Sequence, residues 1–225
     1  MNKVSKKRTL VFGSLVLLSS FFLLTGCGQN QADKSVQNSK TVEMSKDFNS
    51  SAVEKLRIDS GVMDVKIEEG EALHFNVKYI EERKPTMEVK DKTLNFDSKT
   101  NDLSKNDKKL SLSLTFPKGK KFADFNVKQS DGVVEIKGLK TQSLKISSGN
   151  GSITADKLTV IKASSISSGN GGVELSDLTA PGLNISVGNG DISVYGKEVG
   201  KRQYKEGDQE KALKITSGNG SIEIK

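Results

Sequence analysis

Alternating apolar and polar positions recur along most of the chain and predict β-strands. In residues 73–79 four apolar side chains alternate with polar ones, which is the period-2 pattern of a half-buried strand. Residues 94–98, 110–116 and 125–129 follow the same rule. No window carries a convincing apolar stripe at the helical period of about 3.6 residues. The sequence therefore predicts an all-β fold.

A short phrase built around Gly-Asn-Gly recurs four times in the second half of the chain. Aligned on its second glycine, the copies fall at Gly151, Gly171, Gly190 and Gly220, and a decayed copy falls at Gly132. The steps between them are 19, 20, 19 and 30 residues, and the long step contains a charged insertion. Apolar side chains recur five residues before and two residues after this glycine, at Val127, Ile146, Ile166, Ile185 and Ile215, and at Val134, Ile153, Val173, Ile192 and Ile222. A weaker copy places Ile58, Val65 and Ile67 at equivalent positions.

The near-constant spacing favours a β-solenoid made of coils of 19–20 residues with two strands each. Stacked coils need equal lengths, because each coil buries its apolar row only against its neighbours. An antiparallel β-meander or sandwich is the alternative, since Asn-Gly between two strands is also a hairpin signal.

The repeated phrase itself is predicted to turn the chain. Glycine tolerates a positive φ at a sharp corner, and stacked corners would align the asparagines into an amide ladder. The residues concerned are Gly149, Asn150, Gly151, Gly169, Asn170, Gly171, Gly188, Asn189, Gly190, Gly218, Asn219 and Gly220. The preceding Ser147, Ser167, Ser186 and Thr216 would form a row of hydroxyl groups.

The first residues of the chain resemble an export signal rather than part of the fold. Four cations precede an apolar segment over residues 10–24, which is too short for a bilayer-spanning helix of about 20 residues. The segment ends in Leu-Thr-Gly-Cys, which resembles the bacterial lipobox and predicts a diacylglyceryl group on Cys27, the only cysteine. We expect a signal peptide over 1–26, a lipidated cysteine and flexible tether over 27–51, and a β-strand-repeat domain over 52–225. The protein is then anchored to the cell membrane on its extracytoplasmic face.

Removal of the signal peptide also changes the charge argument. The chain has 35 Lys and Arg and 28 acids, and four of the cations lie in the signal, so the balance falls from +7 to 31 − 28 = +3. This is an ordinary surface charge and gives no reason to expect a nucleic-acid partner. Basic clusters at Lys118, Lys120 and Lys121 and at Lys201 and Arg202 could contact anionic lipid or wall polymer, or could simply be solvated turns.

The residues give little support for catalysis or for a bound metal or cofactor. The one histidine, His74, lies on the polar side of its strand, and the only thiol is predicted to be lipidated. Asp191 faintly resembles an acid of calcium-binding nonapeptide repeats, but the other copies lack it. Three glutamates recur three residues after the aligned glycine (Glu135, Glu174 and Glu223), with Thr154 and Ser193 in the other copies. This alternation would keep like charges off adjacent coils, and only secondarily suggests the paired carboxylates of a glycosidase.

The chain stops on a strand, with Ile222 and Ile224 still in the buried register. An open strand edge offers unpaired N–H and C=O groups to another strand. We therefore expect a partner protein or a second copy to dock along residues 216–225 by strand addition. The alternative is that the insertion over 195–212 folds back and covers this edge.

The segment LTFPKGKKFADFNVKQSDGVVEIKGL, followed by SSGNGSI and its copies, resembles the bacterial putative-adhesin family. The resemblance covers roughly residues 52–225 and implies a β-strand-repeat domain of unknown function without catalytic residues. The expected function is a non-enzymatic, membrane-anchored surface lipoprotein that acts as an adhesin-like binding or scaffold module. A regulatory lipoprotein of a cell-envelope stress response is the alternative, because some relatives resemble surface proteins of such operons. A glycan-active solenoid enzyme is a weaker one.

Overall fold

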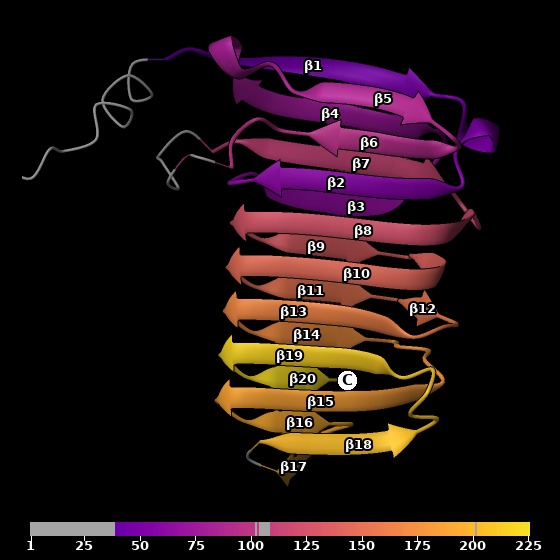
Figure 1. The fold of residues 1–225 in the computed structure, drawn as a ribbon, viewed down its shortest axis with the longest axis vertical. Helices are drawn as coiled ribbons and strands as arrows, with labels where there is room; N and C mark the ends of the chain where they lie inside the picture. Colours follow the sequence, from indigo (N-terminus) through magenta and orange to yellow (C-terminus); the bar gives the residue numbers. More distant parts are fainter. Residues whose placement is uncertain (1–38, 102, 104–108, 201) are drawn as a thin grey trace, which may run out of the picture. The chain divides into compact units, whose positions relative to one another are not determined.

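The computed structural model describes residues 39–101, 103, 109–200 and 202–225, which form two β-sheets packed face to face (Figure 1). In spatial order the first sheet contains β1 (Thr41–Phe48), β4 (Leu73–Ile80), β7 (Ser111–Pro117), β3 (Asp64–Gly70), β9 (Val134–Lys137), β11 (Ile153–Asp156), β14 (Val173–Ser176), β20 (Ile222–Ile224), β16 (Ile192–Val194) and β17 (Lys197–Gly200). The second contains β18 (Gln203–Gly207), β15 (Gly182–Asn189), β19 (Leu213–Asn219), β13 (Ser164–Asn170), β10 (Lys140–Asn150), β8 (Lys121–Asp131), β2 (Lys55–Gly61), β6 (Thr93–Asp97) and β5 (Thr86–Lys90), and β12 (Thr159–Val160) pairs with β10. Two short 3-10 helices, η1 (Ser50–Ala52) and η2 (Glu81–Arg83), complete the described elements.

Seven coils, each with one strand in each sheet, form the middle of the described stack. Adjacent coils pair in parallel, and equivalent residues of the repeat are opposite each other. Ile146, for example, is opposite Val127 on one side and Ile166 on the other. The β-solenoid predicted from the repeat spacing is therefore confirmed, because a meander would have paired successive strands antiparallel. The weak copy over residues 58–67 is one of these coils.

The coils do not stack in the order in which the chain makes them. Beyond β13 and β14, the next coil in space is β19/β20, the last in sequence, and β15/β16 lies outside it. At the other end β2/β3 lies inside β6/β7, which comes later in the chain. At both ends the chain thus runs outward and then returns to fill a layer that it had skipped. Figure 1 shows the C-terminus in the body of the stack, beside β20.

Antiparallel strands close the two ends of the stack. At one end β17 and β18 pair with β16 and β15, and at the other β4 and β5 pair with β7 and β6, with β1 outside β4. Strand β1 lies within the segment 27–51 that was expected to be a tether, so that expectation is wrong for Thr41–Phe48. The sequence gave no clear signal there because an edge strand keeps much of its surface polar and exposed. Residues 1–38 lie outside the described part, and with them Cys27.

The interior is a continuous apolar column between the two sheets. In the coils from β10 onward it consists mainly of aliphatic side chains such as Ile146, Ile166 and Ile215, which are fully buried. The large aromatic rings gather toward the β1 end, where Phe116, Phe122 and others stack edge to face. Full burial of one such aliphatic side chain contributes roughly 1.5–3 kcal/mol, so stability is distributed along the stack.

The predicted docking edge at Ile222 and Ile224 is wrong. Strand β20 pairs in parallel with β14 on one side and with β16 on the other, so neither of its edges is open. Both isoleucines are fully buried. The insertion over 195–212 does fold back, but its strands β17 and β18 cover the edges of β16 and β15. The prediction failed because it assumed that the last coil in the sequence is also the last in the stack.

Candidate binding surfaces

The asparagines of the repeated phrase form a hydrogen-bonded ladder on the exposed corner of the stack. Asn170 Nδ2 donates to Asn150 Oδ1 at 2.7 Å, and Asn219 Nδ2 donates to Asn170 Oδ1 at 2.7 Å. Asn189 Nδ2 continues the series by donating to Asn219 Oδ1 at 2.8 Å. The ladder follows the spatial order of the coils, so the C-terminal asparagine lies inside it. These amides therefore satisfy one another along the stack.

The two glycines of the phrase have different roles. The second glycine, such as Gly151 with φ +140°, has a backbone conformation that side chains rarely adopt. The first, such as Gly149, has no positive φ, but a Cβ there would lie 2.6 Å from the carbonyl oxygen of Ser130 in the coil beneath. The asparagine between them is extended strand rather than a left-handed corner residue. The phrase thus sets the spacing of the coils as well as the turn.

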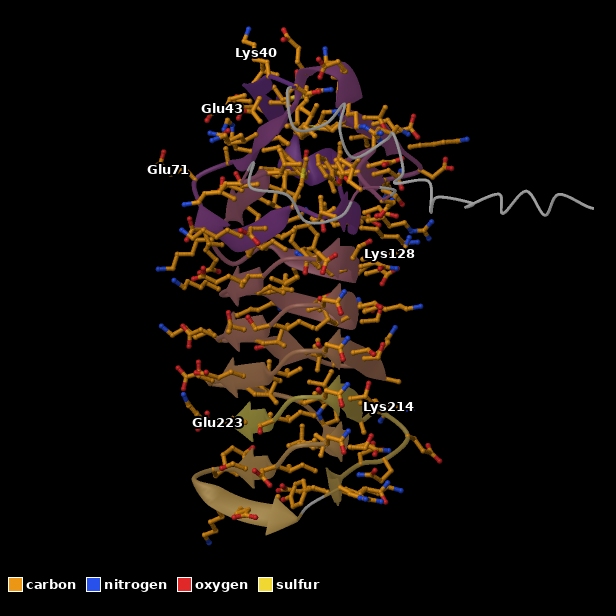
Figure 2. The ribbon with its side chains drawn as sticks, turned by 90° about the vertical axis from the view of Figure 1, so that its left-hand side faces the viewer. Lys40, Glu43, Glu71, Lys128, Lys214 and Glu223 are labelled. Atoms are coloured by element: carbon orange, nitrogen blue, oxygen red, sulfur yellow. The ribbon has the colours of Figure 1, made fainter. Side chains whose placement is uncertain are left out.

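Hydroxyl groups line the second sheet next to the ladder. Ser147, Ser167, Thr216 and Ser186 are half-buried and occupy equivalent positions on adjacent strands. The following residues point inward, where Ser168 Oγ donates to Gly151 O at 3.2 Å and Ser217 Oγ donates to Gly171 O at 2.9 Å. The outer face of the second sheet is therefore a regular polar surface. In Figure 2, Lys128 and Lys214 project from this side of the stack and Glu223 from the opposite side.

The row of glutamates on the first sheet differs from the alternation read from the sequence. Because β20 inserts next to β14, Glu174 and Glu223 are direct neighbours. Lys225 Nζ lies 2.6 Å from Glu174 Oε1 and 3.5 Å from Glu223 Oε2. Hydrogen bonding to Glu174 raises the pKa of Lys225 above its usual value. The like charges are therefore compensated by the last residue of the chain and not by spacing.

The other singled-out residues lie apart from one another. His74 Nδ1 lies 2.7 Å from Asp47 Oδ1 on the strand pair β1 and β4, and Asp191 is exposed at the turn into β16. Among the described residues no group of His, Cys, Asp or Glu is arranged to hold a metal ion. The same part of the chain contains no helix long and apolar enough to cross a bilayer.

The basic cluster after β7 divides between a structural and a surface role. Lys120 Nζ donates to the carbonyl oxygens of Ser50 and Val53 at 2.6 and 2.7 Å, so it fixes the segment around η1. Lys118 and Lys121 remain exposed. Of the second cluster, Arg202 is exposed and Lys201 lies outside the described residues.

Lys140 is a neighbour of Lys121 that the sequence reading missed. It is the Cα partner of Lys121 on the adjacent strand. Each lysine lies 11 residues before the aligned glycine of its own copy, at Gly151 and Gly132 respectively. Extending the repeat alignment that far would have revealed the pair.

Comparison with known proteins agrees with this architecture. No curated protein matches the chain. A crystal structure of a putative cell adhesion protein from Clostridium sporogenes is 23% identical, with a TM-score of 0.60 over 82% of this chain and 99% of the other. A putative adhesin from Bacteroides fragilis is 16% identical, with a TM-score of 0.36 over 83% of this chain and 97% of the other. The family model described as Toastrack DUF4097 matches residues 53–225. The chain therefore belongs to the Toastrack DUF4097 family.

Proposed function

We propose that the protein is a non-enzymatic surface lipoprotein, anchored through Cys27, whose stack of coils presents repeated polar side chains to an extracytoplasmic partner. The observation that carries this proposal is the regular row of exposed amides and hydroxyls on hydrogen-bonded parallel coils. Stacked repeats of this kind provide extended surfaces suited to long or polymeric partners. The Clostridium sporogenes protein of similar fold is described as a putative cell adhesion protein, which is consistent with such a role.

The exposed carboxylates favour a binding role over glycan cleavage. A general acid of a glycosidase needs a carboxyl group whose pKa is raised, usually by an apolar pocket. The Glu174 and Glu223 side chains are 48% and 46% exposed, and both contact Lys225. Solvent and a neighbouring cation both stabilise the ionised form.

The lipid anchor would keep the stack close to the membrane. Strand β1 begins at Thr41, 14 residues after Cys27. A fully extended chain of this length spans at most about 50 Å, at roughly 3.6 Å per residue. A partner must therefore be a membrane component, an inner wall component or a protein that reaches this zone.

The anchor is tested by replacing Cys27. In cells grown with labelled palmitate, we expect the wild-type protein to carry label and to sediment with membranes. Cys27→Ser should carry no label, because serine offers no sulfur for the thioether to the diacylglyceryl group. A double variant, Cys27→Ser with Ser35→Cys, is the matched control: it restores a thiol outside the lipobox and should also stay unlabelled. Palmitate on either variant would contradict the proposed anchor.

A further inference from the structure

A groove follows one corner of the stack, where strands of the second sheet begin. We call it the corner groove. Its larger part has a volume of about 700 Å³, and its lining includes Lys121, Phe122, Lys140, Thr159 and Ile161. A smaller part of about 330 Å³ shares Lys140 and Thr159 and adds Lys118 and Lys157 from two corner turns. Strand β12, seen beside the start of β10 in Figure 1, marks this corner. The groove therefore crosses several coils and collects four lysines.

Two of these lysines face each other without compensation. Lys121 and Lys140 are Cα partners on β8 and β10, and adjacent strands lie about 4.8 Å apart. Like charges directly opposite on neighbouring strands are destabilising. Within the described part of the chain, neither ammonium group forms an ion pair with an acid.

Like charges meet as Cα partners at two other places in the described strands, and there each charge is compensated. Asp59 is opposite Asp97, with Asp59 Oδ2 lying 3.0 Å from the ammonium of Lys128 and Asp97 Oδ2 lying 2.6 Å from that of Lys99. The second place is the glutamate pair bridged by the C-terminal lysine. Only the lysine pair of the corner groove is left without an opposite charge from the described chain. An anion from outside would supply it.

The acids that line the corner groove are already engaged or lie at its margin. Glu54 forms an ion pair with Lys92 at 2.6 Å, and this hydrogen bond lowers the pKa of Glu54. Glu69 Oε1 accepts a hydrogen bond from the Gly119 amide at 3.0 Å. Asp177 lines only the smaller part and is exposed at its turn. The acids therefore do not bridge the lysine pair.

We propose that the corner groove binds a linear phosphodiester polymer, with Lys121 and Lys140 holding one phosphate and Lys118 and Lys157 holding others along the corner. Lysine ammonium groups bind phosphate as point charges, and the Thr159 hydroxyl is placed in both parts of the groove as a further donor. Ile161, which is 53% exposed, offers an apolar contact for the carbon backbone of the polymer. The concave shape admits a chain but not the flat surface of a bilayer. The inference deepens the proposed function, since it names the class of partner.

The test uses the mature lipoprotein in detergent and a fluorescent glycerol-phosphate oligomer, with binding followed by anisotropy at several salt concentrations. The double variant Lys121→Gln/Lys140→Gln should bind at least about tenfold more weakly. The slope of log affinity against log salt should also fall by about 1 for each lysine removed. Its melting temperature should not decrease, because the substitution removes a repulsion.

The matched control is Lys145→Gln/Lys214→Gln, which removes the same charge from exposed positions on the outer face of the second sheet. It should change the affinity less than about twofold, because screened charges outside the site contribute little. Equal losses in both double variants, or no binding of the oligomer by wild type, would overturn the proposal. Equal binding of polyglutamate would overturn the assignment to phosphate. Groove-dependent binding to phosphatidylglycerol vesicles without oligomer binding would overturn the assignment to a polymer. None of these results depends on Cys27, so failure here is distinct from failure of the anchor.

Discussion

Single residues of the repeated phrase are fixed by the distance between coils. The first glycine of each copy has an ordinary φ, yet a Cβ at Gly169, Gly188 or Gly218 would lie 2.5 Å from a carbonyl oxygen of the next coil. Real Cβ atoms do not approach an oxygen so closely, and backbone cannot move aside as a flexible side chain can. Glycine is therefore required for close stacking of the backbone and not for the turn alone.

We expect Gly169→Ala to destabilise the protein by about 1–3 kcal/mol, because its methyl group would push β13 away from β10. Gly172→Ala is the matched control in the same turn. A Cβ there meets only the carbonyl oxygen of Ser221, at 3.3 Å, and its φ is not positive. Urea unfolding monitored by circular dichroism measures both. Equal losses of stability would contradict the close-approach explanation.

At the scale of elements, neighbouring strands must agree in charge as well as in register. Insertion of β20 beside β14 places Glu174 against Glu223, and Lys225 compensates both. The last residue of the chain thus helps to join the last coil to its neighbour. Its contribution is that of an exposed ion pair and depends on the ammonium remaining charged.

The pH dependence of this contribution has a definite sign. The folded-state pKa of Lys225 is raised above 10.5, chiefly by its hydrogen bond to Glu174, so the folded state holds the proton more tightly than the unfolded state. The stabilisation is therefore complete below about 10.5 and is lost as pH rises through the folded-state pKa. Lys225→Met should lower stability at neutral pH and differ less from wild type above that range, as measured by urea unfolding. The difference should also shrink in a Glu174→Gln background, and a difference unaffected by both pH and Glu174 would contradict this account.

At the scale of the whole described stack, the C-terminal coil is an internal layer. Tyr195 N donates to Ile224 O at 2.7 Å and Lys225 N donates to Leu175 O at 2.8 Å, so the coils on both sides hold the chain end. Chain termini usually fray because few contacts hold them. Here the terminal strand completes two interfaces at once, so its loss would separate β14 from β16.

Hydrogen exchange tests the position of this coil. We expect the amides of β20 to exchange as slowly as those of β11 in the middle of the stack, and far more slowly than those of the edge strand β5. Mass spectrometry of peptides covering residues 213–225 measures this directly. Exchange of β20 as fast as that of β5 would mean that the last coil is not held between two others.

The local pattern of the sequence determined the all-β class, the two-strand coil and the register of its apolar rows. Each of these follows from residues within about 20 positions of one another, such as the isoleucines around Gly151 and Gly171. The corner glycines and the amide ladder were also readable, because they repeat with the coil. The polar edge strand β1 was not readable, since an exposed edge carries little apolar pattern.

Only the tertiary structure decided the order of the coils, and with it the neighbours on each surface. Coils built on one repeat have the same hydrogen-bonding edges and the same apolar row, so the coil at Gly220 can stack as well against one at Gly171 as against one at Gly190. Nothing in the repeat itself distinguishes these choices, and the reach of the connecting chain selects among them. The burial of Ile222, the contact of Glu174 with Glu223 and the pairing of Lys121 with Lys140 are all properties of this arrangement in space.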